Sequence, residues 1–376
     1  MIRDIKITNY RLFDEFEISS LARVNLIVGN NNSGKSSLLE AIHLLTSDEV
    51  RASLLYILNE RGEIVSGIVD KKYDRGYRIG YQISQIFHNR TIKPGQSASI
   101  SSTADTKMTL KIVLRDTASS SREGEVGQAT LFDEEELMNM GVINRGYVDS
   151  LVFERNGTRQ DLPNEKLRIE EDVLLAPASL GFRRGMSPKG KSRFLTTNYI
   201  GYDELALLWN NITLTPKEDK VVEALQILEP QVDRISFTSN QTSNSGILLR
   251  LKDEYEPIPL GSMGDGMRRI LAIAASLVSV EKGTLLVDEI DTGLYHGALV
   301  DMWRLVLETS SKQNAQVFAT THSWDCVKAF QQALDEYNDP EIGRLIRIEK
   351  SATRIKTVPY SANELDIAVE QGIEVR

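Results

Sequence analysis

An eight-residue stretch near the start of the chain combines the residue types that bind phosphate groups. Residues 29–36 read GNNNSGKS and fit the pattern GxxxxGK[ST] at every fixed position. In this pattern the glycines allow a tight turn, backbone N–H groups face the phosphates, the lysine neutralises the β and γ groups, and the hydroxyl meets Mg²⁺. The sequence therefore predicts an ATP and Mg²⁺ site, for which the expected binding residues are Gly29, Asn30, Asn31, Asn32, Ser33, Gly34, Lys35, Ser36 and Ser37.

Two adjacent carboxylates follow an apolar run much later in the chain. The segment TLLVDEID reads as a buried strand that ends in Asp288 and Glu289. In open α/β sheets, ligands bind at the carboxyl ends of the strands. We expect Asp288 to hold Mg²⁺ together with Ser36, and Glu289 to orient or deprotonate the attacking water.

Two further features complete the candidate chemistry. The segment QVFATTHS places His322 at the end of another apolar strand, where its imidazole could reach the γ-phosphate. The segment PLGSMGDGMRRILAIAASL places Ser262 and Gly264 before a helix whose N-terminus suits an anion. Because the chain already has a phosphate loop, this second turn makes sense if it caps the γ-phosphate of another subunit.

The elements that must position these residues alternate between strands and helices. At the start, the pattern predicts strands at residues 2–7, 14–19 and 23–29 and a helix at 36–45. In the last third it predicts helices at 267–279 and 298–312, strands at 283–291 and 315–323, a hairpin over 344–360 and a short helix capped by Ser361 with Glu364. Such alternation is typical of a largely parallel, covered sheet.

The middle of the chain has a different character. Residues 49–245 are polar and strand-rich, with a half-buried strand around 108–114, a loop-like stretch at 117–128, helical signal over 202–229 and a hairpin pattern over 232–254. We therefore predict an α/β protein whose ATPase core comes from residues 1–48 and 246–376. Residues 49–245 are expected to form a β-rich, partly helical insertion.

Composition narrows the class of protein. The 376 residues contain one cysteine and four scattered histidines, which excludes a disulfide framework and cysteine-based zinc clusters. The N-terminus is charged and no stretch approaches 18 uncharged apolar residues, so we expect no membrane span and a cytoplasmic protein. The net charge is −9, yet residues 181–194 form a basic patch, which is either a solvated loop or a docking site for DNA, RNA or a partner.

Taken in order, these motifs resemble the ABC-type ATPase heads of the SMC, RecF and OLD group. The resemblance covers residues 1–46 and 255–325, and ITNYRLFDEFEI, GSMGDGMRRI, DEIDTGLYH and ATTHSWD are most similar to OLD-like AAA ATPases of phage-defence operons. It implies a P-loop NTPase fold with a mixed sheet flanked by helices. It also implies that Ser262 and Gly264 contact ATP across a homodimer, with two ATP molecules held between the heads.

Some positions depart from the pattern of this group. Asp265 stands where transporters usually carry Gln, Tyr295 and His296 replace the usual Leu-Asp, and we place no Q-loop glutamine. The residues after His322 are too few for the TOPRIM nuclease domain of OLD proteins and contain no DxD cluster. We therefore expect a chain without its own nuclease.

Two functions remain open at this point. In the first, the protein is an Mg²⁺-dependent ATPase that acts as a sensor or scaffold for a separately encoded effector, such as a TOPRIM or HNH nuclease, in anti-phage defence. In the second, it is a RecF-like ATPase that binds DNA during repair, and the acidic balance weighs against it. A transporter subunit is disfavoured by the strand-rich middle segment.

Overall fold

The computed structural model describes most of the chain in several stretches. These are residues 1–69, 77–93, 95–103, 108–115, 150–160, 168–170, 173–177, 190–198, 200–238, 246–337, 339–351 and 354–376. The loop predicted at 117–128 and residues 181–189 of the basic patch lie outside the described residues.

A six-stranded sheet forms the centre of the molecule, in the order β12-β16-β17-β3-β18-β19. All neighbouring strands are parallel except β19, which pairs antiparallel with β18. The strand bounds are Ser192–Leu195 (β12), Thr284–Val287 (β16), Gln316–Thr320 (β17), Val24–Gly29 (β3), Gly343–Lys350 (β18) and Ile355–Tyr360 (β19). The mixed sheet expected from the alternating pattern is therefore present, and its five parallel strands have their carboxyl ends at one edge.

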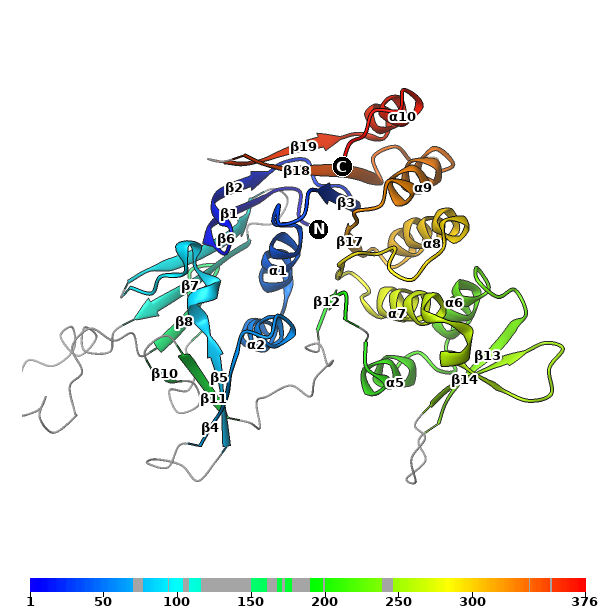
Figure 1. Ribbon diagram of the computed structural model, residues 1–376, viewed down its shortest axis with the longest axis horizontal. Coiled ribbons are helices and arrows are strands. Elements are labelled where there is room, and N and C mark those ends of the chain that lie inside the picture. Colours follow the sequence, from blue (N-terminus) through cyan, green and yellow to red (C-terminus); the bar gives the residue numbers. More distant parts are fainter. Residues whose placement is uncertain are drawn as a thin grey trace, which may run out of the picture.

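Both faces of this sheet are covered, as Figure 1 shows. Within β16, Leu285 and Val287 join one buried apolar cluster and Leu286 joins the other, so the strand is apolar on both sides. The first cluster lies under the helices α7, α8 and α9, and the second lies under α1 and α2. Their bounds are Lys35–Thr46 (α1), Val50–Glu60 (α2), Asp265–Ser279 (α7), Leu299–Lys312 (α8) and Trp324–Asp335 (α9).

Antiparallel sheets flank α1 and α2 on the side away from the core sheet (Figure 1). One has the order β2-β1-β6-β7-β8-β9 and the other β10-β11-β5-β4. The first comprises Ile5–Tyr10 (β1), Phe13–Ile18 (β2), Ser97–Ser102 (β6), Met108–Arg115 (β7), Ser150–Arg155 (β8) and Thr158–Gln160 (β9). The second comprises Ile64–Val69 (β4), Tyr77–Gln82 (β5), Arg168–Glu170 (β10) and Val173–Pro177 (β11). The half-buried strand predicted around residues 108–114 is confirmed as β7.

The middle segment contributes more to the core than its polar character suggests. Strand β12 lies within residues 49–245, yet it pairs in parallel with β16 in the core sheet. The helix α2 was not predicted. Its run from Leu54 to Leu58 is buried almost throughout, so it lacks the polar face that marks an amphipathic helix.

The other predicted helices and hairpins are confirmed. They are the helices α5 (Tyr202–Asn210), α6 (Pro216–Leu225) and α10 (Ala362–Glu370), and the antiparallel pair β13 (Val232–Thr238) and β14 (Gly246–Leu251), which β15 (Ile258–Pro259) extends. Ser361 and Glu364 form the expected capping box at the start of α10. Among the described residues, no helix is long and apolar enough to cross a membrane.

Candidate active site

The phosphate loop, residues 29–37, connects β3 to α1 at the carboxyl edge of the core sheet. Its backbone is left-handed at Gly29 (φ 145°), Asn32 (φ 59°) and Gly34 (φ 106°). A Cβ on Gly29 would lie 2.5 Å from the Ile348 carbonyl oxygen, and one on Gly34 would lie 2.9 Å from the Phe13 ring. Glycine is thus required at both positions by conformation and by space.

Lys35 begins α1 and its side chain turns into the loop. Its Nζ donates to the carbonyl oxygens of Gly29 at 2.8 Å and Asn30 at 3.1 Å. Burial lowers the pKa of the Lys35 ammonium, while the nearby carboxylates of Asp288 and Glu289 act in the opposite direction. The ammonium is therefore held at the centre of the loop, where it can neutralise phosphate oxygens.

Ser36 and Asp288 come together although 252 positions separate them in the chain. The Ser36 hydroxyl donates to Asp288 Oδ2 at 2.7 Å. The other carboxylate oxygen, Oδ1, accepts a hydrogen bond from the Thr320 hydroxyl at 2.6 Å. An adjacent hydroxyl and carboxylate oxygen are the hard donors that Mg²⁺ takes beside nucleotide phosphates, so these residues fit the expected ion.

Glu289 and His322 face each other beside this pair. Glu289 has a left-handed backbone, with φ 48°, and its N–H donates to the Thr320 hydroxyl at 2.8 Å. His322 Nε2 lies 3.7 Å from Glu289 Oε1. Burial, with a contribution from the Lys35 charge, lowers the pKa of His322 from its usual 6.5. The imidazole is therefore neutral at pH 7 and can donate one N–H to a phosphate oxygen.

A cavity of about 260 Å³ joins these groups. The phosphate loop from Asn32 to Ser37 lines it together with Asp288, Glu289 and His322. The structure thus brings the residues predicted from three separate motifs into one site. Three arginines that the motifs did not identify also line the cavity, namely Arg11, Arg61 and Arg90.

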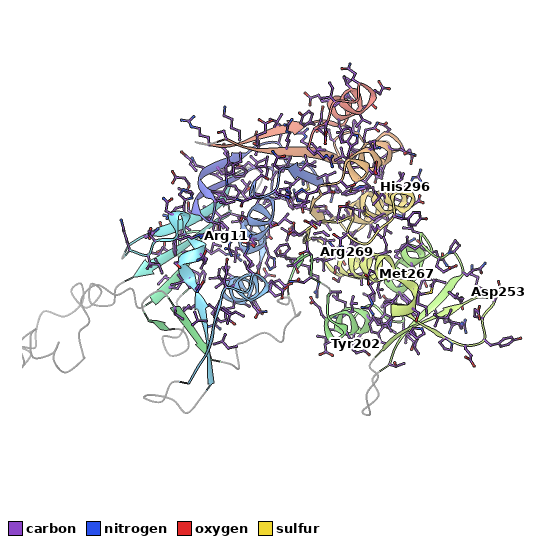
Figure 2. All side chains as sticks on the ribbon, in the orientation of Figure 1. Arg11, Tyr202, Asp253, Met267, Arg269 and His296 are labelled. Atoms are coloured by element: carbon purple, nitrogen blue, oxygen red, sulfur yellow. The ribbon has the colours of Figure 1, made fainter. Side chains whose placement is uncertain are left out.

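Arg11 belongs to a buried ionic cluster next to the loop, beside the N-terminal strands (Figure 2). Its Nε lies 2.5 Å from Glu40 on α1, and its Nη1 lies 2.8 Å from Glu63. Arg61 pairs with the same Glu40 carboxylate. A buried pair is costly to break from one side, so the cluster fixes α1 against the N-terminal strands. Its only sequence signal was an arginine in the NYRLF segment, which carries no distinctive spacing.

Ser262 and Gly264 lie apart from this cavity, although both are within the described residues. We call residues 262–264 the signature turn. It spans the end of a short 3-10 helix (Leu260–Met263) and the left-handed Gly264, with φ 90°, that precedes α7. Both residues are exposed. They are therefore available to a second molecule rather than to the phosphate loop of their own chain.

The residues after β12 lie close to Ser36 and Asp288, although the motifs identified none of them and no Q-loop glutamine was found in the sequence. Thr196, Thr197 and Asn198 line a smaller cavity together with Ser36 and Asp288. The Thr196 hydroxyl and the Asn198 amide both donate to Glu60, at 3.2 and 3.0 Å. The polar groups that line this cavity with Ser36 and Asp288 therefore include threonine, asparagine and glutamate, which a search for a glutamine does not find.

Comparisons with known proteins agree with this geometry. Residues 1–168 match the family described as "AAA ATPase domain", and residues 149–325 match "AAA domain, putative AbiEii toxin, Type IV TA system". A solved SMC head bound to the C-winged helix domain of ScpA superposes with a TM-score of 0.53 at 13% identity, covering 96% of this chain and 98% of the other. The fold is that of an ABC-type P-loop ATPase.

Two curated relatives extend the comparison of this ATPase. An "ATP/GTP phosphatase" of Helicobacter pylori is 23% identical, over 89% of each chain. The "DNA replication and repair protein RecF" of Oceanobacillus iheyensis is 42% identical over 45 residues, or 12% of each chain. The family matches and the phosphatase relative support an ATP-hydrolysing enzyme of the AAA type, the SMC head shares its fold, and the similarity to RecF is confined to 45 residues.

Proposed function

We propose that this protein is an Mg²⁺-dependent ATPase whose two heads close around two ATP molecules, and that the closed dimer controls a separately encoded effector. The observation that carries the proposal is the separation of two phosphate-binding elements. Lys35 and Ser36 line the catalytic cavity, whereas Ser262 and Gly264 are exposed on another part of the surface. Both can contact one nucleotide only if a second copy supplies the signature turn.

The binding step follows from the charges of the loop. Lys35 would neutralise the β- and γ-phosphates, and the loop N–H groups would bind their oxygens. Ser36 and Asp288 would hold Mg²⁺, which when bound stabilises the charge on the β- and γ-phosphate oxygens. Thr320 keeps the Asp288 carboxylate in place because its hydroxyl donates to the oxygen that does not face Ser36.

The hydrolytic step uses the pair at the strand ends. Glu289 would accept a proton from a water molecule as its oxygen attacks the γ-phosphorus, and the bond to the β-γ bridging oxygen breaks. The neutral His322, 3.7 Å from the Glu289 carboxylate, would donate an N–H to the γ-phosphate oxygens as their charge shifts. ADP and inorganic phosphate leave, and the heads separate.

ATP controls the dimer because one of its contacts exists only in the closed state. A ligand shifts an equilibrium by its differential affinity for the two states, and a γ-phosphate shared between subunits supplies such a difference. We infer that an effector, such as a TOPRIM or HNH nuclease, reads the closed form. A role in anti-phage defence is supported by the resemblance of the motifs to OLD-like ATPases. The matched family description also names a putative toxin.

A second candidate is a RecF-like ATPase that binds DNA. The observation in its favour is the 42% identity to RecF over 45 residues. In that case ATP should strengthen binding to duplex DNA, and the affinity should fall steeply with salt. The net charge of −9 argues against a large DNA-binding surface.

The dimer proposal is tested by the mass of the particle in solution. With ATP and Mg²⁺, we expect Glu289→Gln to form a stable dimer by light scattering, because it binds nucleotide but cannot activate water. Lys35→Ala should keep, with ATP and Mg²⁺, the mass that it has without nucleotide. The proposal is wrong if the two variants have the same mass with ATP.

The effector proposal needs a separate experiment. Glu289→Gln is used as bait with ATP in extracts of the native host, with and without nuclease treatment. A stoichiometric protein that survives nuclease treatment supports the effector role. Recovery of duplex DNA without such a protein favours the RecF-like function instead.

A further inference from the structure

Arg269 connects α7 to the ends of two core strands. In Figure 2 it lies between α7 and the core sheet. Its Nη2 donates to the carbonyl oxygens of Asp288 at 2.6 Å and Glu289 at 3.0 Å, and its Nη1 donates to that of Thr196 at 3.1 Å. Because a guanidinium presents its donors in a rigid fork, one side chain fixes the backbone after β16 and after β12 relative to α7.

The backbone of Glu289 needs such support. A non-glycine residue with φ near 48° is strained and persists only when its surroundings hold it. Thr320 binds the N–H of Glu289, and Arg269 binds its carbonyl oxygen. The direction of the Glu289 carboxylate therefore depends on the position of α7.

The signature turn directly precedes α7, on the N-terminal side of Arg269. The first turn of the helix packs tightly on the segment after Glu289, since a Cβ on Gly266 would lie 2.7 Å from the Gly293 carbonyl oxygen. From Gly264 to Arg269 the helix rises only about 7.5 Å, a length over which it moves as a rigid body. A shift at the exposed end must therefore reach the guanidinium.

We propose that Arg269 is a positioning residue that couples the signature turn to Glu289 within one subunit. Contact of Ser262 and Gly264 with the partner's nucleotide sets α7, and Arg269 transmits that position to the Glu289 carbonyl. This inference rests on the proposed ATP-sandwiched dimer. It adds the element that makes hydrolysis in one active site depend on the nucleotide held by the other.

The first test separates turnover from binding. Arg269→Gln loses the fork, so we expect kcat to fall by about 10- to 100-fold, as for other small misplacements of a catalytic group. ATP affinity and the thermal midpoint should stay close to wild type, and Arg269→Lys should be intermediate. Arg304→Gln is the matched control, because the Arg304 guanidinium on α8 pairs with Asp301 and Glu336 at the surface. Its kcat should equal that of the wild type.

The second test is a double-mutant cycle with Ser262→Ala, which removes the hydroxyl of the signature turn without blocking the turn. If Arg269 transmits the state of that turn, the loss of kcat in the double variant should be smaller than the product of the losses in Ser262→Ala and Arg269→Gln. If Arg269→Gln does not fold, the same cycle is measured with Arg269→Lys.

Several results would overturn the coupling. These are additive losses in the cycle, an unchanged kcat in Arg269→Gln, or a parallel loss of ATP affinity and thermal stability. Failure of the proposed function itself would look different, because Glu289→Gln and Lys35→Ala would then have the same mass with ATP whatever Arg269 does.

Discussion

At the scale of single residues, the site depends on side chains that hold the catalytic groups as much as on the groups themselves. Thr320 illustrates this, since its hydroxyl donates to Asp288 Oδ1 and accepts from the Glu289 N–H. It therefore fixes the carboxylate proposed to hold the metal and the backbone of the residue proposed to activate water. The segment ATTHS gave no reason to select this threonine over its neighbour.

We predict that Thr320→Val lowers ATPase activity by about 10- to 100-fold and raises the Mg²⁺ concentration needed for half-maximal rate. Valine has nearly the same shape but cannot make either hydrogen bond. Steady-state rates over a magnesium titration measure the effect. Thr320→Ser keeps the hydroxyl and should retain most of the activity; an equal loss in both variants would refute the assigned role.

A second prediction at this scale concerns stability in acid. Burial lowers the pKa of His43, on α1, from 6.5 to about 3. Below pH 6.5, His43 takes up a proton in the unfolded chain but stays neutral in the folded protein. The free energy of unfolding therefore decreases as the pH falls towards 3. The free energy of unfolding should decrease by roughly 1 kcal/mol per pH unit from this group alone.

Urea unfolding between pH 7 and 4 checks this prediction, with His43→Gln as the comparison. The variant lacks the titrating group, so its free energy of unfolding should vary less steeply over the same range. Identical slopes in the two proteins would show that His43 does not remain neutral in the folded state.

At the scale of elements, the residues proposed to be catalytic are brought together by parallel strands that end at one edge. The phosphate loop, the carboxylate pair and His322 follow β3, β16 and β17, which are neighbours in the order β16-β17-β3. Each strand is followed by a turn whose backbone conformation depends on its own residues. The glycines of the phosphate loop are the clearest case.

Gly34→Ala tests the geometry of the loop. The new methyl group would meet the Phe13 ring at 2.9 Å in a left-handed conformation. We expect a loss of about 1–3 kcal/mol in stability and a marked loss of ATP affinity. Gly62→Ala is the control, because Gly62 is also left-handed but no atom lies within 4 Å of its Cβ position. If the two variants bind ATP equally well, crowding at Phe13 is unimportant.

Much of this arrangement could be predicted from the sequence, because the motifs carry their own strand-turn-helix context. The helix α2 and the pairing of β12 could not. The Leu54–Leu58 run is buried on all sides and shows no helical period. Strand β12 has only four residues, Ser192–Leu195, and follows a basic stretch that reads as a loop. Its partner β16 is distant in the chain, so no local signal specifies the pairing.

The same limit applies to the polar groups around Ser36 and Asp288, the proposed metal ligands. Arg269 and Thr196 are ordinary residues of a helix and a strand end, and they reach the site only through the packing of α7 and β12. The residues next to them in the sequence are of the same types, so the sequence alone does not single them out. Motifs thus identified the groups proposed to react, and the tertiary structure was needed to find those that hold them.

At the scale of the whole molecule, the central claim is that one subunit cannot complete an active site. The signature turn is exposed and does not line the catalytic cavity, so the proposed dimer would have two composite sites. In a symmetric dimer each subunit gives its phosphate loop to one site and its signature turn to the other. Two different inactive variants should therefore complement each other.

The most direct measurement is the ATPase rate of a mixture of Lys35→Ala and Ser262→Arg. Each variant alone should be inactive. In a mixed dimer, one site pairs the intact phosphate loop of Ser262→Arg with the intact signature turn of Lys35→Ala. An equimolar mixture should recover activity up to a ceiling of about a quarter of the wild-type rate, since half of the dimers are mixed and each has one intact site. Loss of the coupling through Arg269 in the subunit with the blocked turn should lower the rate below this ceiling but not abolish it. A mixture as inactive as its components, formed from variants that still dimerise, would contradict the shared active site.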